Sequence, residues 1–315
     1  MTDDLTVAVL AGGLSHEREV SLRSGRRVAD ALRSSGCDVI VLDADAHLLP
    51  RLAQERPGVV WPVLHGAIGE DGALRDVLDL LGLSYVGARP GPCRLAWDKP
   101  IAQSIVAAAG ISVPRSIALP HATFRDLGAQ PVLAAAADWT GFPLVVKPGR
   151  GGSALGVTVV RDPRDLARAV VDSFAYGDTA LVQEHVPGVE VAVSVVEVDG
   201  DVRVLPAVEI VADGGSYDYA ARYTAGATEF FAPARLAEDV ADHLAKAARA
   251  AHEALGLRHL SRVDFLVTGD GDPVFLEANA APGMTETSLL PLAVQAAGLE
   301  LDAVYRGIVE SALRT

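Results

Sequence analysis

A predicted β-hairpin between Arg262 and Gly283 constrains this chain more than any other segment. Asp270-Gly271 lies at its middle and is typical of a two-residue type I′ turn, in which both central residues need a positive φ. A turn at this position places Asp264 opposite Glu277 and Arg262 opposite Asn279. Because side chains alternate along a strand, all four are expected on one face of the hairpin.

The polar face of this hairpin suits either metal binding or exposure to water. Two carboxylates opposite each other repel unless positive charge lies between them, and oxygen ligands at this spacing suit a hard cation such as Mg²⁺. A solvated hairpin is the alternative, since exposed charged faces are common. The other face is expected to join a core through the cross-strand pairs Val263–Ala278, Phe265–Leu276 and Val267–Val274.

Composition narrows the class of protein. The chain has 315 residues, enough for about two domains of ~150 residues each, and its net charge of -14 disfavours binding to nucleic acids or anionic membranes. No apolar run approaches the ~18 residues that span a bilayer, and the first residues carry acids where a secretory signal has bases, so a cytoplasmic protein is expected. Cys37 and Cys93 suit a reducing compartment and form no metal motif.

The first part of the chain alternates strands and helices. An apolar strand from Thr6 to Leu10 leads through a glycine turn into a helix, and further strands are expected from Asp38 to Leu42 and from Val59 to Leu64. This order predicts a parallel sheet that binds ligands at the carboxyl ends of its strands, where Glu17 and His65 lie. Each of the two has a structural alternative, a carboxylate favoured by a helix N-terminus and a satisfied loop histidine.

A glycine-rich loop from Gly149 to Gly156 lies between two predicted strands. Glycines let backbone N–H groups turn toward an anion, as in phosphate-binding loops. Lys147 precedes the glycines, so this is not a Walker A loop, and the loop leads into a strand rather than a helix, so it is not a dinucleotide-binding fingerprint. The segment predicts a loop that covers phosphates, with a flexible hairpin as the alternative.

The second half is expected to be antiparallel. Asp199-Gly200 is another hairpin turn between two β-rich runs. Residues 211–228 hold three tyrosines, Arg222 and several glycines. Long glycine-spaced segments between elements are often functional lids, so a lid is expected here.

Seven motifs in this order and spacing resemble those of the D-alanine:D-alanine ligases of the ATP-grasp superfamily, and they cover nearly the whole chain. They read AGGLSHEREVS, LHGAIGEDG, WDK, VKPGRGGSALGV, YDYAARY, RVDF and LEANAAPGMTETSLLP. The resemblance implies an ATP-grasp fold of the α/β class, α+β in its C-terminal half. It implies a Rossmann-like N-terminal domain (1–96), a central subdomain with the glycine loop (97–180) and a C-terminal subdomain with the metal site and lid (181–315).

The resemblance also implies a reaction and its residues. Two D-alanines would be joined through a D-alanyl phosphate, with release of ADP and phosphate, for peptidoglycan precursor synthesis. Two Mg²⁺ ions, for which Mn²⁺ could substitute, would be held by Asp264, Glu277 and Asn279. The implied ATP-binding residues are Lys99, Lys147, Gly151, Gly152, Ser153, Gln183, Glu184, Val186 and Glu190.

The implied substrate residues come from several distant segments. Glu17 would bind the ammonium group of the first amino acid and form a hydrogen-bonded triad with Ser153 and Tyr223. Arg262 and the backbone N–H of Gly283 would stabilise the oxyanion when the second amine attacks. The other implied substrate-binding residues are His65, Arg222, Ser288 and Leu289. A homodimer and a K⁺ requirement are further expectations from the family.

Three positions depart from the usual family pattern. Arg222 stands where a lysine is usual, Ala154 replaces the second serine of the loop, and Ala280-Ala281 replace Thr-Ser or Thr-Leu. These changes leave the acceptor amino acid open, although Tyr223 favours an amide over an ester product. The alternatives are a ligase for another D-amino acid dipeptide and a nucleotide-binding regulator without turnover. A nicotinamide oxidoreductase is disfavoured because the glycine fingerprint is missing.

Overall fold

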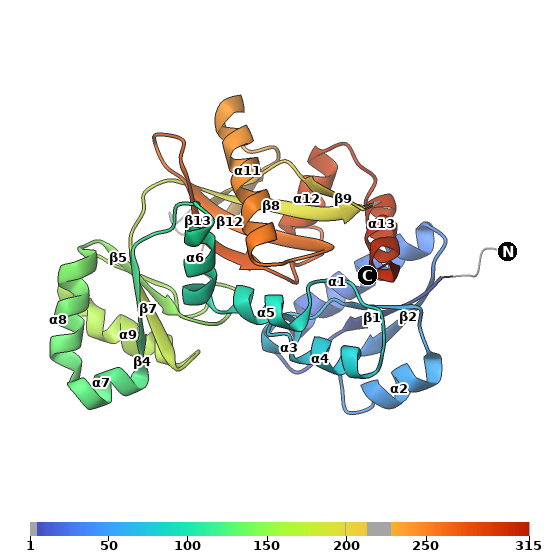
Figure 1. The fold of residues 1–315 in the computed structure, drawn as a ribbon, viewed down its shortest axis with the longest axis horizontal. Helices are drawn as coiled ribbons and strands as arrows, with labels where there is room; N and C mark the ends of the chain where they lie inside the picture. Colours follow the sequence, from blue (N-terminus) through green and yellow to red (C-terminus); the bar gives the residue numbers. More distant parts are fainter. Residues whose placement is uncertain (1–4, 199, 213–227, 315) are drawn as a thin grey trace.

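The computed structural model describes residues 5–198, 200–212 and 228–314, which form three sheets surrounded by helices (Figure 1). One sheet is parallel and two are antiparallel. The predicted α/β class, with antiparallel sheets in the later part of the chain, is therefore confirmed. No helix in the described ranges is long and apolar enough to cross a membrane.

The N-terminal sheet has the strand order β2-β1-β3. Its strands are apolar, as expected for a parallel sheet that is covered by helices, and Val7, Val9 and Val60 are fully buried. The carboxyl ends of β1 and β3 carry the loops that contain Glu17 and His65. The elements of this region are β1 (Thr6–Ala11), α1 (Arg18–Ser34), β2 (Asp38–Asp43), α2 (Leu48–Glu55), β3 (Val59–Pro62), α3 (Ala67–Glu70) and α4 (Ala73–Leu80).

The second sheet has the order β4-β7-β5-β6 and lies at the far end of the molecule from the N-terminal sheet (Figure 1). The glycine-rich loop joins its neighbouring strands β5 and β6, as the sequence predicts. The elements here are β4 (Ser116–Pro120), α7 (His121–Leu127), α8 (Ala129–Thr140), β5 (Leu144–Pro148), β6 (Thr158–Val160), the 3-10 helix η1 (Pro163–Asp165), α9 (Leu166–Phe174) and β7 (Thr179–Glu184).

The third sheet occupies the middle of the molecule and has the order β11-β10-β8-β12-β13, with β9 paired to β8. Val198 pairs with Asp201, so β8 and β9 form the expected hairpin, while Asp199 of the expected turn lies outside the described residues. The strands are β8 (Val189–Val198), β9 (Asp201–Val204), β10 (Val208–Ala212), β11 (Thr228–Phe231), β12 (Leu260–Val267) and β13 (Pro273–Asn279).

Both faces of the third sheet are packed. One face packs on α5, α6 and α11 in a core that includes Val191, Val263 and Phe265. The other face packs on α12 and α13 in a core that also contains Trp61 of the N-terminal sheet, so this core spans two sheets. The helices are α5 (Pro90–Trp97), α6 (Lys99–Ala108), α11 (Glu238–Ala254), α12 (Leu289–Ala296) and α13 (Leu301–Leu313). The predicted domain boundaries near residues 96 and 180 stay a prediction.

The register of the β12–β13 hairpin is partly as predicted. Arg262 pairs with Asn279, Val263 with Ala278 and Asp264 with Glu277, as expected. Beyond Asp264 the predicted register is wrong. The observed outer pairs are Phe265–Phe275, Leu266–Val274 and Val267–Pro273.

The physical reason for this difference is a longer loop compensated by a β-bulge. Gly271 has a φ of 85° but Asp270 has no positive φ, so no type I′ turn forms. The backbone N–H of Thr268 instead donates to the carbonyl of Asp272, 3.0 Å away, and residues 268–272 form the loop. Leu276 is the additional residue of the bulge, and it restores the expected pairing at Glu277.

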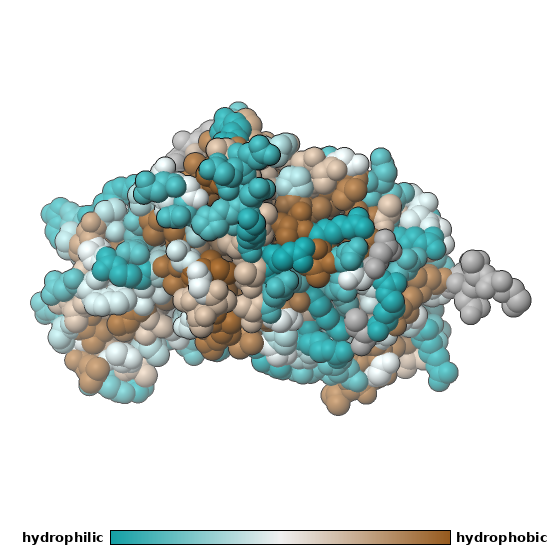
Figure 2. Space-filling model, turned by 45° about the horizontal axis from the view of Figure 1, so that its top comes forward, coloured by the Kyte–Doolittle hydropathy of each residue, from teal (hydrophilic) through white to brown (hydrophobic). Residues whose placement is uncertain are grey.

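The surface in Figure 2 mixes hydrophilic and hydrophobic residues over the visible face, without separating them into two halves. Many ion pairs are exposed and short in sequence range, such as Arg306 with Glu310 on α13. Exposed pairs of this kind contribute little to stability. Among the buried charged residues, Lys99, Lys147 and Asp264 line a cavity between the second and third sheets.

Candidate active site

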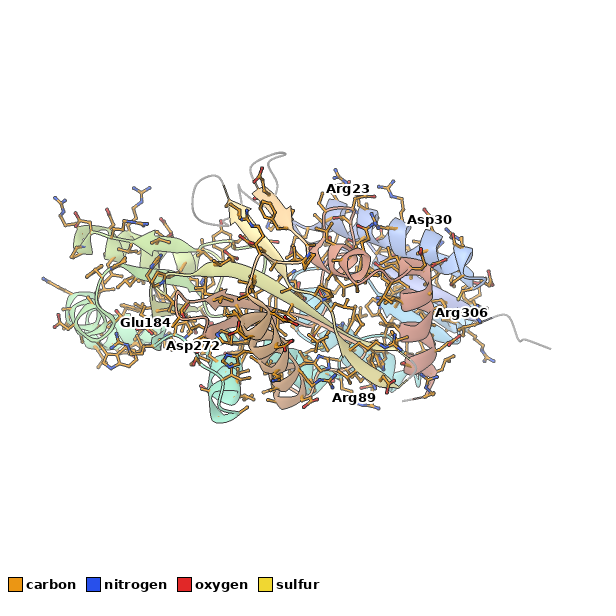
Figure 3. The ribbon with its side chains drawn as sticks, turned by 90° about the horizontal axis from the view of Figure 1, so that it is seen from above. Arg23, Asp30, Arg89, Glu184, Asp272 and Arg306 are labelled. Carbon is orange, nitrogen blue, oxygen red and sulfur yellow. The ribbon has the colours of Figure 1, made fainter. Side chains whose placement is uncertain are left out.

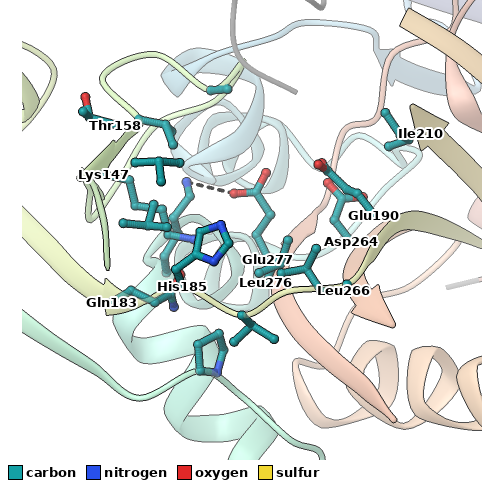
Figure 4. Close-up of a pocket in the computed structure, with 18 of the residues that line it drawn as sticks. Lys147, Thr158, Gln183, His185, Glu190, Ile210, Asp264, Leu266, Leu276 and Glu277 are labelled. Carbon is teal, nitrogen blue, oxygen red and sulfur yellow. Dashed lines mark ion pairs between the residues drawn. The ribbon is translucent and has the colours of Figure 1, made fainter. Parts of the chain in front are cut away.

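A cavity of about 790 Å³ lies between the second and third sheets (Figure 4). It is lined by side chains from strands of both sheets, so neither sheet could form it alone. Lys147 faces it from β5, and the carboxylates of Glu190, Asp264 and Glu277 lie across the cavity from that lysine (Figure 4). The predicted ATP-binding residues that line it are Lys99, Lys147, Gly151, Gly152, Gln183, Glu184, Val186 and Glu190.

Two buried lysines occupy the end of this cavity near the glycine-rich loop. The ammonium of Lys99 lies 3.3 Å from a carboxylate oxygen of Glu277, an ion pair that Figure 4 marks with a dashed line. It also donates to the carbonyl of Gly151 at 2.5 Å. Burial lowers the pKa of Lys147 to about 8, although the charge of Glu277 opposes this shift. The two cations make this end of the cavity suitable for anionic groups.

Glu184 lines the cavity, but its carboxylate is hydrogen-bonded to Arg115. It accepts hydrogen bonds from the backbone N–H and the guanidinium of Arg115, each at 2.8 Å. Because its carboxylate is engaged by Arg115, Glu184 presents mainly its backbone to a ligand in the cavity. The neighbouring amide of Gln183 is buried, and its Nε2 has no hydrogen-bond partner among the described residues.

The polar face of the hairpin is arranged as ion pairs. Arg262 donates to both carboxylate oxygens of Asp264 at 2.8 Å, and both side chains are buried. The amide oxygen of Asn279 accepts from the backbone N–H of Ala281 at 2.8 Å. Within the described residues, no group of three or more His, Cys, Asp and Glu side chains is arranged to hold a metal ion.

This donor set still fits Mg²⁺. Asp264 on β12 and Glu277 on β13 are direct cross-strand neighbours. Asn279, two residues after Glu277 on β13, adds an amide oxygen. Mg²⁺ is usually bound through one or two carboxylates together with substrate phosphates and waters, rather than by a complete cage of protein ligands. Two carboxylates beside a lysine-lined anion pocket therefore suit a magnesium–phosphate complex.

A second cavity of about 390 Å³ adjoins the first, on the side of the N-terminal sheet. The two cavities share Lys99, Gly151, Gly152 and Glu277 in their walls. Ser153, expected at the ATP, lines this second cavity rather than the first. The predicted residues in its wall are Glu17, His65, Ser153, Arg262, Asn279, Gly283, Ser288 and Leu289.

Glu17 and Ser153 are in contact, which connects the start of α1 to the glycine-rich loop. The Ser153 hydroxyl donates a short hydrogen bond to the Glu17 carboxylate. Tyr223, the expected third member of this triad, lies outside the described residues, as does Arg222. The pairing of Glu17 with Ser153 is therefore present, and the role of the tyrosine stays a prediction.

An ion pair holds the loop that carries Glu17. Arg18 contacts both oxygens of Asp43, and it also donates to the carbonyl of Gly13 at 2.8 Å. Asp43 in turn accepts from the backbone N–H of Gly13 at 2.9 Å. Gly12, with a φ of 91°, is required here because a Cβ would lie 2.4 Å from the carboxylate of Asp43. Asp43 and Arg18 therefore hold the N–H and the carbonyl of Gly13, respectively, in this loop.

His65 is buried between the N-terminal sheet and the loop after β13. Burial lowers its pKa, while the charge of Glu17 and a backbone hydrogen bond with Ala281 raise it. Its Nε2 atom lies 3.5 Å from the hydroxyl of Ser24. A neutral imidazole in this position can exchange hydrogen bonds without adding charge.

Glu70 is a site residue that the sequence reasoning missed. It lines the second cavity, and burial together with the charge of Glu17 raises its pKa to about 8. Its carboxylate accepts from the backbone N–H of Gly66 at 2.9 Å. The motif LHGAIGEDG was visible in the sequence, but a glutamate on a short helix gives no local sign that it is buried.

Comparisons with known proteins agree with the ligase motifs found in the sequence. Residues 105–310 match the family described as the D-ala D-ala ligase C-terminus. The D-alanine--D-alanine ligase of Anaeromyxobacter sp. (strain K) is 40% identical over 306 residues, which cover 97% of this chain and 96% of that protein. The chain belongs to the D-alanine:D-alanine ligase family. The ligase of Halalkalibacterium halodurans is 39% identical over 98% of this chain and 100% of its own length.

Solved ligase structures have the same fold. The D-alanine--D-Alanine ligase of Bacillus anthracis matches with a TM-score of 0.85 and 29% identity, covering 98% of each chain, and that enzyme has also been solved with ATP. The VanG D-Ala:D-Ser ligase of Enterococcus faecalis matches with a TM-score of 0.85 and 28% identity, covering 98% of this chain and 100% of that one. These matches confirm the predicted ATP-grasp ligase fold.

Two of the three departures from the family pattern lie in the wall of a cavity or directly beside one. Ala154 lines the first cavity. Ala280 and Ala281 are buried directly after β13, ahead of Gly283, which lines the second cavity. The third departure, Arg222, lies outside the described residues.

Proposed function

We propose that this protein uses ATP to join two D-alanines into D-alanyl-D-alanine. Its curated relatives are named D-alanine--D-alanine ligases. One structural observation carries the proposal. The lysine-lined cavity and the second, smaller cavity meet at Lys99, Gly151, Gly152 and Glu277, so a phosphoryl group bound in one would lie beside a carboxylate bound in the other. An enzyme that phosphorylates a carboxylate needs this arrangement.

In the first step the carboxylate of one D-alanine attacks the γ-phosphorus of ATP, which forms D-alanyl phosphate and releases ADP. Lys99 and Lys147 would bind the phosphates, and positioning of this kind provides most of the catalysis in phosphoryl transfer. Residues 183–186 would border the adenine and Glu190 would hold the ribose. Glu17, tied to Ser153, would bind the ammonium of the first D-alanine.

Asp264, Glu277 and Asn279 would hold magnesium at the phosphates. The bound metal neutralises charge on the transferring phosphoryl group. In the structure Arg262 engages Asp264 and Lys99 engages Glu277, so positive charge already faces each carboxylate. Asp264 lines the first cavity, and Glu277 lines both cavities.

In the second step the amine of another D-alanine attacks the acyl carbon, phosphate leaves, and the amine loses a proton. Negative charge develops on the carbonyl oxygen in the tetrahedral state. Arg262 and the backbone N–H of Gly283 would stabilise this oxyanion. Ser288 and Leu289 would bracket the carboxylate of the second D-alanine at the N-terminus of α12, which favours an anion.

The activity is tested by ADP release with Mg²⁺ and ATP in the presence of D-alanine, with L-alanine as the control and the product mass recorded. Asp264→Asn should abolish turnover, whereas Asp270→Asn, at an exposed position on the hairpin loop, should not. ATP binding without turnover on any D-amino acid would contradict the proposal and favour a regulator.

A second candidate keeps the chemistry and changes the acceptor. The VanG D-Ala:D-Ser ligase is as similar in structure as the B. anthracis enzyme, and Ala280-Ala281 differ from the usual pattern. A mixed assay with D-alanine and D-serine decides between the two by the mass of the dipeptide. A homodimer, K⁺ stimulation, Mn²⁺ substitution and a cytoplasmic location are further proposals, which light scattering, cation titration and fractionation would test.

A further inference from the structure

The loop that follows β13, here called the Pro282 loop (residues 280–284), is largely buried. Ala280, Ala281 and Met284 are each less than a tenth exposed. Gly283 lines the second cavity, and a Cβ at this glycine would lie 2.9 Å from the hydroxyl of Ser288. The position of the Gly283 N–H therefore depends on how the loop is held.

Both ends of the Pro282 loop are held by residues of the N-terminal domain. The hydroxyl of Ser24, on α1, accepts a hydrogen bond from the backbone N–H of Met284 at 3.1 Å. The side chain of His65, which follows β3, is hydrogen-bonded to the backbone of Ala281. The Ser24 hydroxyl keeps its own proton for a second acceptor, and Nε2 of His65 lies 3.5 Å away. Ser24 and His65 thus link Ala281 to Met284 across the loop.

The C-terminal helix holds the Met284 side chain. The hydroxyl of Tyr305, on α13, donates to the Met284 sulfur at 3.3 Å. The ring of Tyr305 packs edge-on against Trp61 of β3, with 5.2 Å between the ring centroids. Helices α1 and α13 lie side by side in both ribbon views, and Arg306 of α13 donates to the carbonyl of Ser35 just after α1 (Figures 1 and 3).

We propose that Ser24 is a positioning residue that fixes the Gly283–Met284 segment for the second step of ligation, with Tyr305 supporting it from the other side. The inference rests on the proposed function, in which the Gly283 N–H stabilises the oxyanion. Ser24 itself touches neither substrate. It acts through the backbone N–H of Met284, the residue directly after Gly283.

The physical reason is the burial of the groups involved. Ser24 and Tyr305 have 0% exposure and Met284 has 1%, so water cannot replace a lost partner without a rearrangement. Removing the Ser24 hydroxyl leaves a buried N–H without its acceptor, and the peptide is expected to rotate toward another one. A shift of about 1 Å in a catalytic donor can lower a rate by about a hundredfold.

Ser24→Ala tests the proposal, with Ser173→Ala as the matched control. Ser173 is also fully buried on a helix, but its hydroxyl donates to Val170 on α9, in the second sheet's core. We expect kcat for dipeptide formation to fall about tenfold or more in Ser24→Ala and to stay near wild type in Ser173→Ala. The Kd for ATP should be unchanged in both, because Ser24 lies outside the first cavity.

The ratio of ADP released to dipeptide formed distinguishes positioning from a general loss of structure. Wild type should give one ADP per dipeptide. In Ser24→Ala the acyl phosphate should form at the normal rate but react more slowly with the amine. Water then hydrolyses part of the acyl phosphate, and the ratio of ADP to dipeptide rises above one. A lower thermal stability with an unchanged kcat and an unchanged ratio would overturn the proposal.

Tyr305→Phe keeps the inference testable where Ser24→Ala does not fold. This change removes only the hydroxyl that contacts Met284, and a smaller fall in the same step, with a raised ratio, is expected. The double variant should lose less than the product of the two single effects, because both act on one segment. Independent, multiplying effects would contradict the proposal. Absence of D-alanine ligation by wild type would instead refute the proposed function.

Discussion

The hydroxyl of Ser153 donates a hydrogen bond to the carboxylate of Glu17, so the tip of the glycine-rich loop is tied to the start of α1. The two residues are 136 positions apart in the sequence. Because Glu17 is expected to bind the first substrate and the loop to cover the phosphates, one contact joins both binding sites. The first testable prediction concerns this contact.

Ser153→Ala is expected to lower kcat/KM for D-alanine about tenfold, since a hydrogen bond to a charged group is worth roughly 1.5–3 kcal/mol. Ser153 and Ala154 both have a φ of 55°, so alanine at position 153 adds no new backbone strain. Ala154→Gly is the control, because it keeps the Ser153 hydroxyl. Steady-state kinetics with each substrate varied in turn checks the result. Equal effects of the two variants would remove the hydroxyl from this account.

Asp43→Asn is expected to raise the KM for D-alanine several-fold and to change the KM for ATP little. The substitution removes the charge that holds Arg18, and Arg18 fixes the carbonyl of Gly13 in the loop that carries Glu17. The Arg18 guanidinium also holds the pKa of Asp43 below its usual range, so the carboxylate is charged at neutral pH. The exposed Asp30→Asn on α1 is the control. A rise in both KM values would indicate a global effect instead.

ATP binding to the free enzyme is expected to weaken above about pH 8. Burial lowers the pKa of Lys147 to about 8, so the amine loses its positive charge as the pH rises past this value. The affinity should fall several-fold between pH 8 and 9. Calorimetric titration of ATP over pH 7–9 measures this. Lys147→Arg, which stays charged, should remove most of the dependence, and an unchanged profile would contradict it.

The stability of the protein is expected to fall as the pH decreases below about 6.5, in part through His259. Burial lowers its pKa to about 3, and the charge of Arg258 acts in the same direction. The unfolded chain, with a pKa near 6.5, then binds more protons between these values, so the free energy of unfolding decreases with falling pH. The contribution is about 1 kcal/mol per pH unit just below 6.5.

His259→Asn tests this contribution. Asparagine tolerates the left-handed backbone at this position, where φ is 63°, and it does not titrate. Urea unfolding at pH 7.5, 6.5 and 5.5 should show that the stability gap between wild type and the variant narrows as the pH falls. The exposed His47→Asn is the control. A constant gap would mean that His259 takes up a proton equally in both states.

The β12–β13 hairpin shows how far local patterns reach. Apolar and polar residues alternate along the two strands near the site, and this alternation correctly predicted the partners of Arg262 and Asp264. The outer pairs were wrong because the loop depends on whether Asp270 adopts a positive φ, which its residue type permits but does not require. The bulge at Leu276 then restored the pairing at the site.

Glu70 shows what local patterns cannot reach. Its burial depends on packing between the N-terminal sheet and the glycine-rich loop, and a Cβ on Gly152 would lie 3.8 Å from its carboxylate. The same holds for Ser24, which occupies an ordinary buried position on α1. Only the approach of the Pro282 loop, 260 residues later in the chain, gives its hydroxyl a partner.

The sequence by itself determined the elements, the order of the motifs and the family, because these depend on short-range periodicity and on residue types at fixed spacing. The tertiary structure alone decided two contacts of the site, the ion pair of Lys99 with Glu277 and the hydrogen bond of Ser153 to Glu17. Each of these two contacts joins segments that are far apart in the chain. Their geometry follows from how the sheets pack on shared cores, and no local pattern encodes that packing.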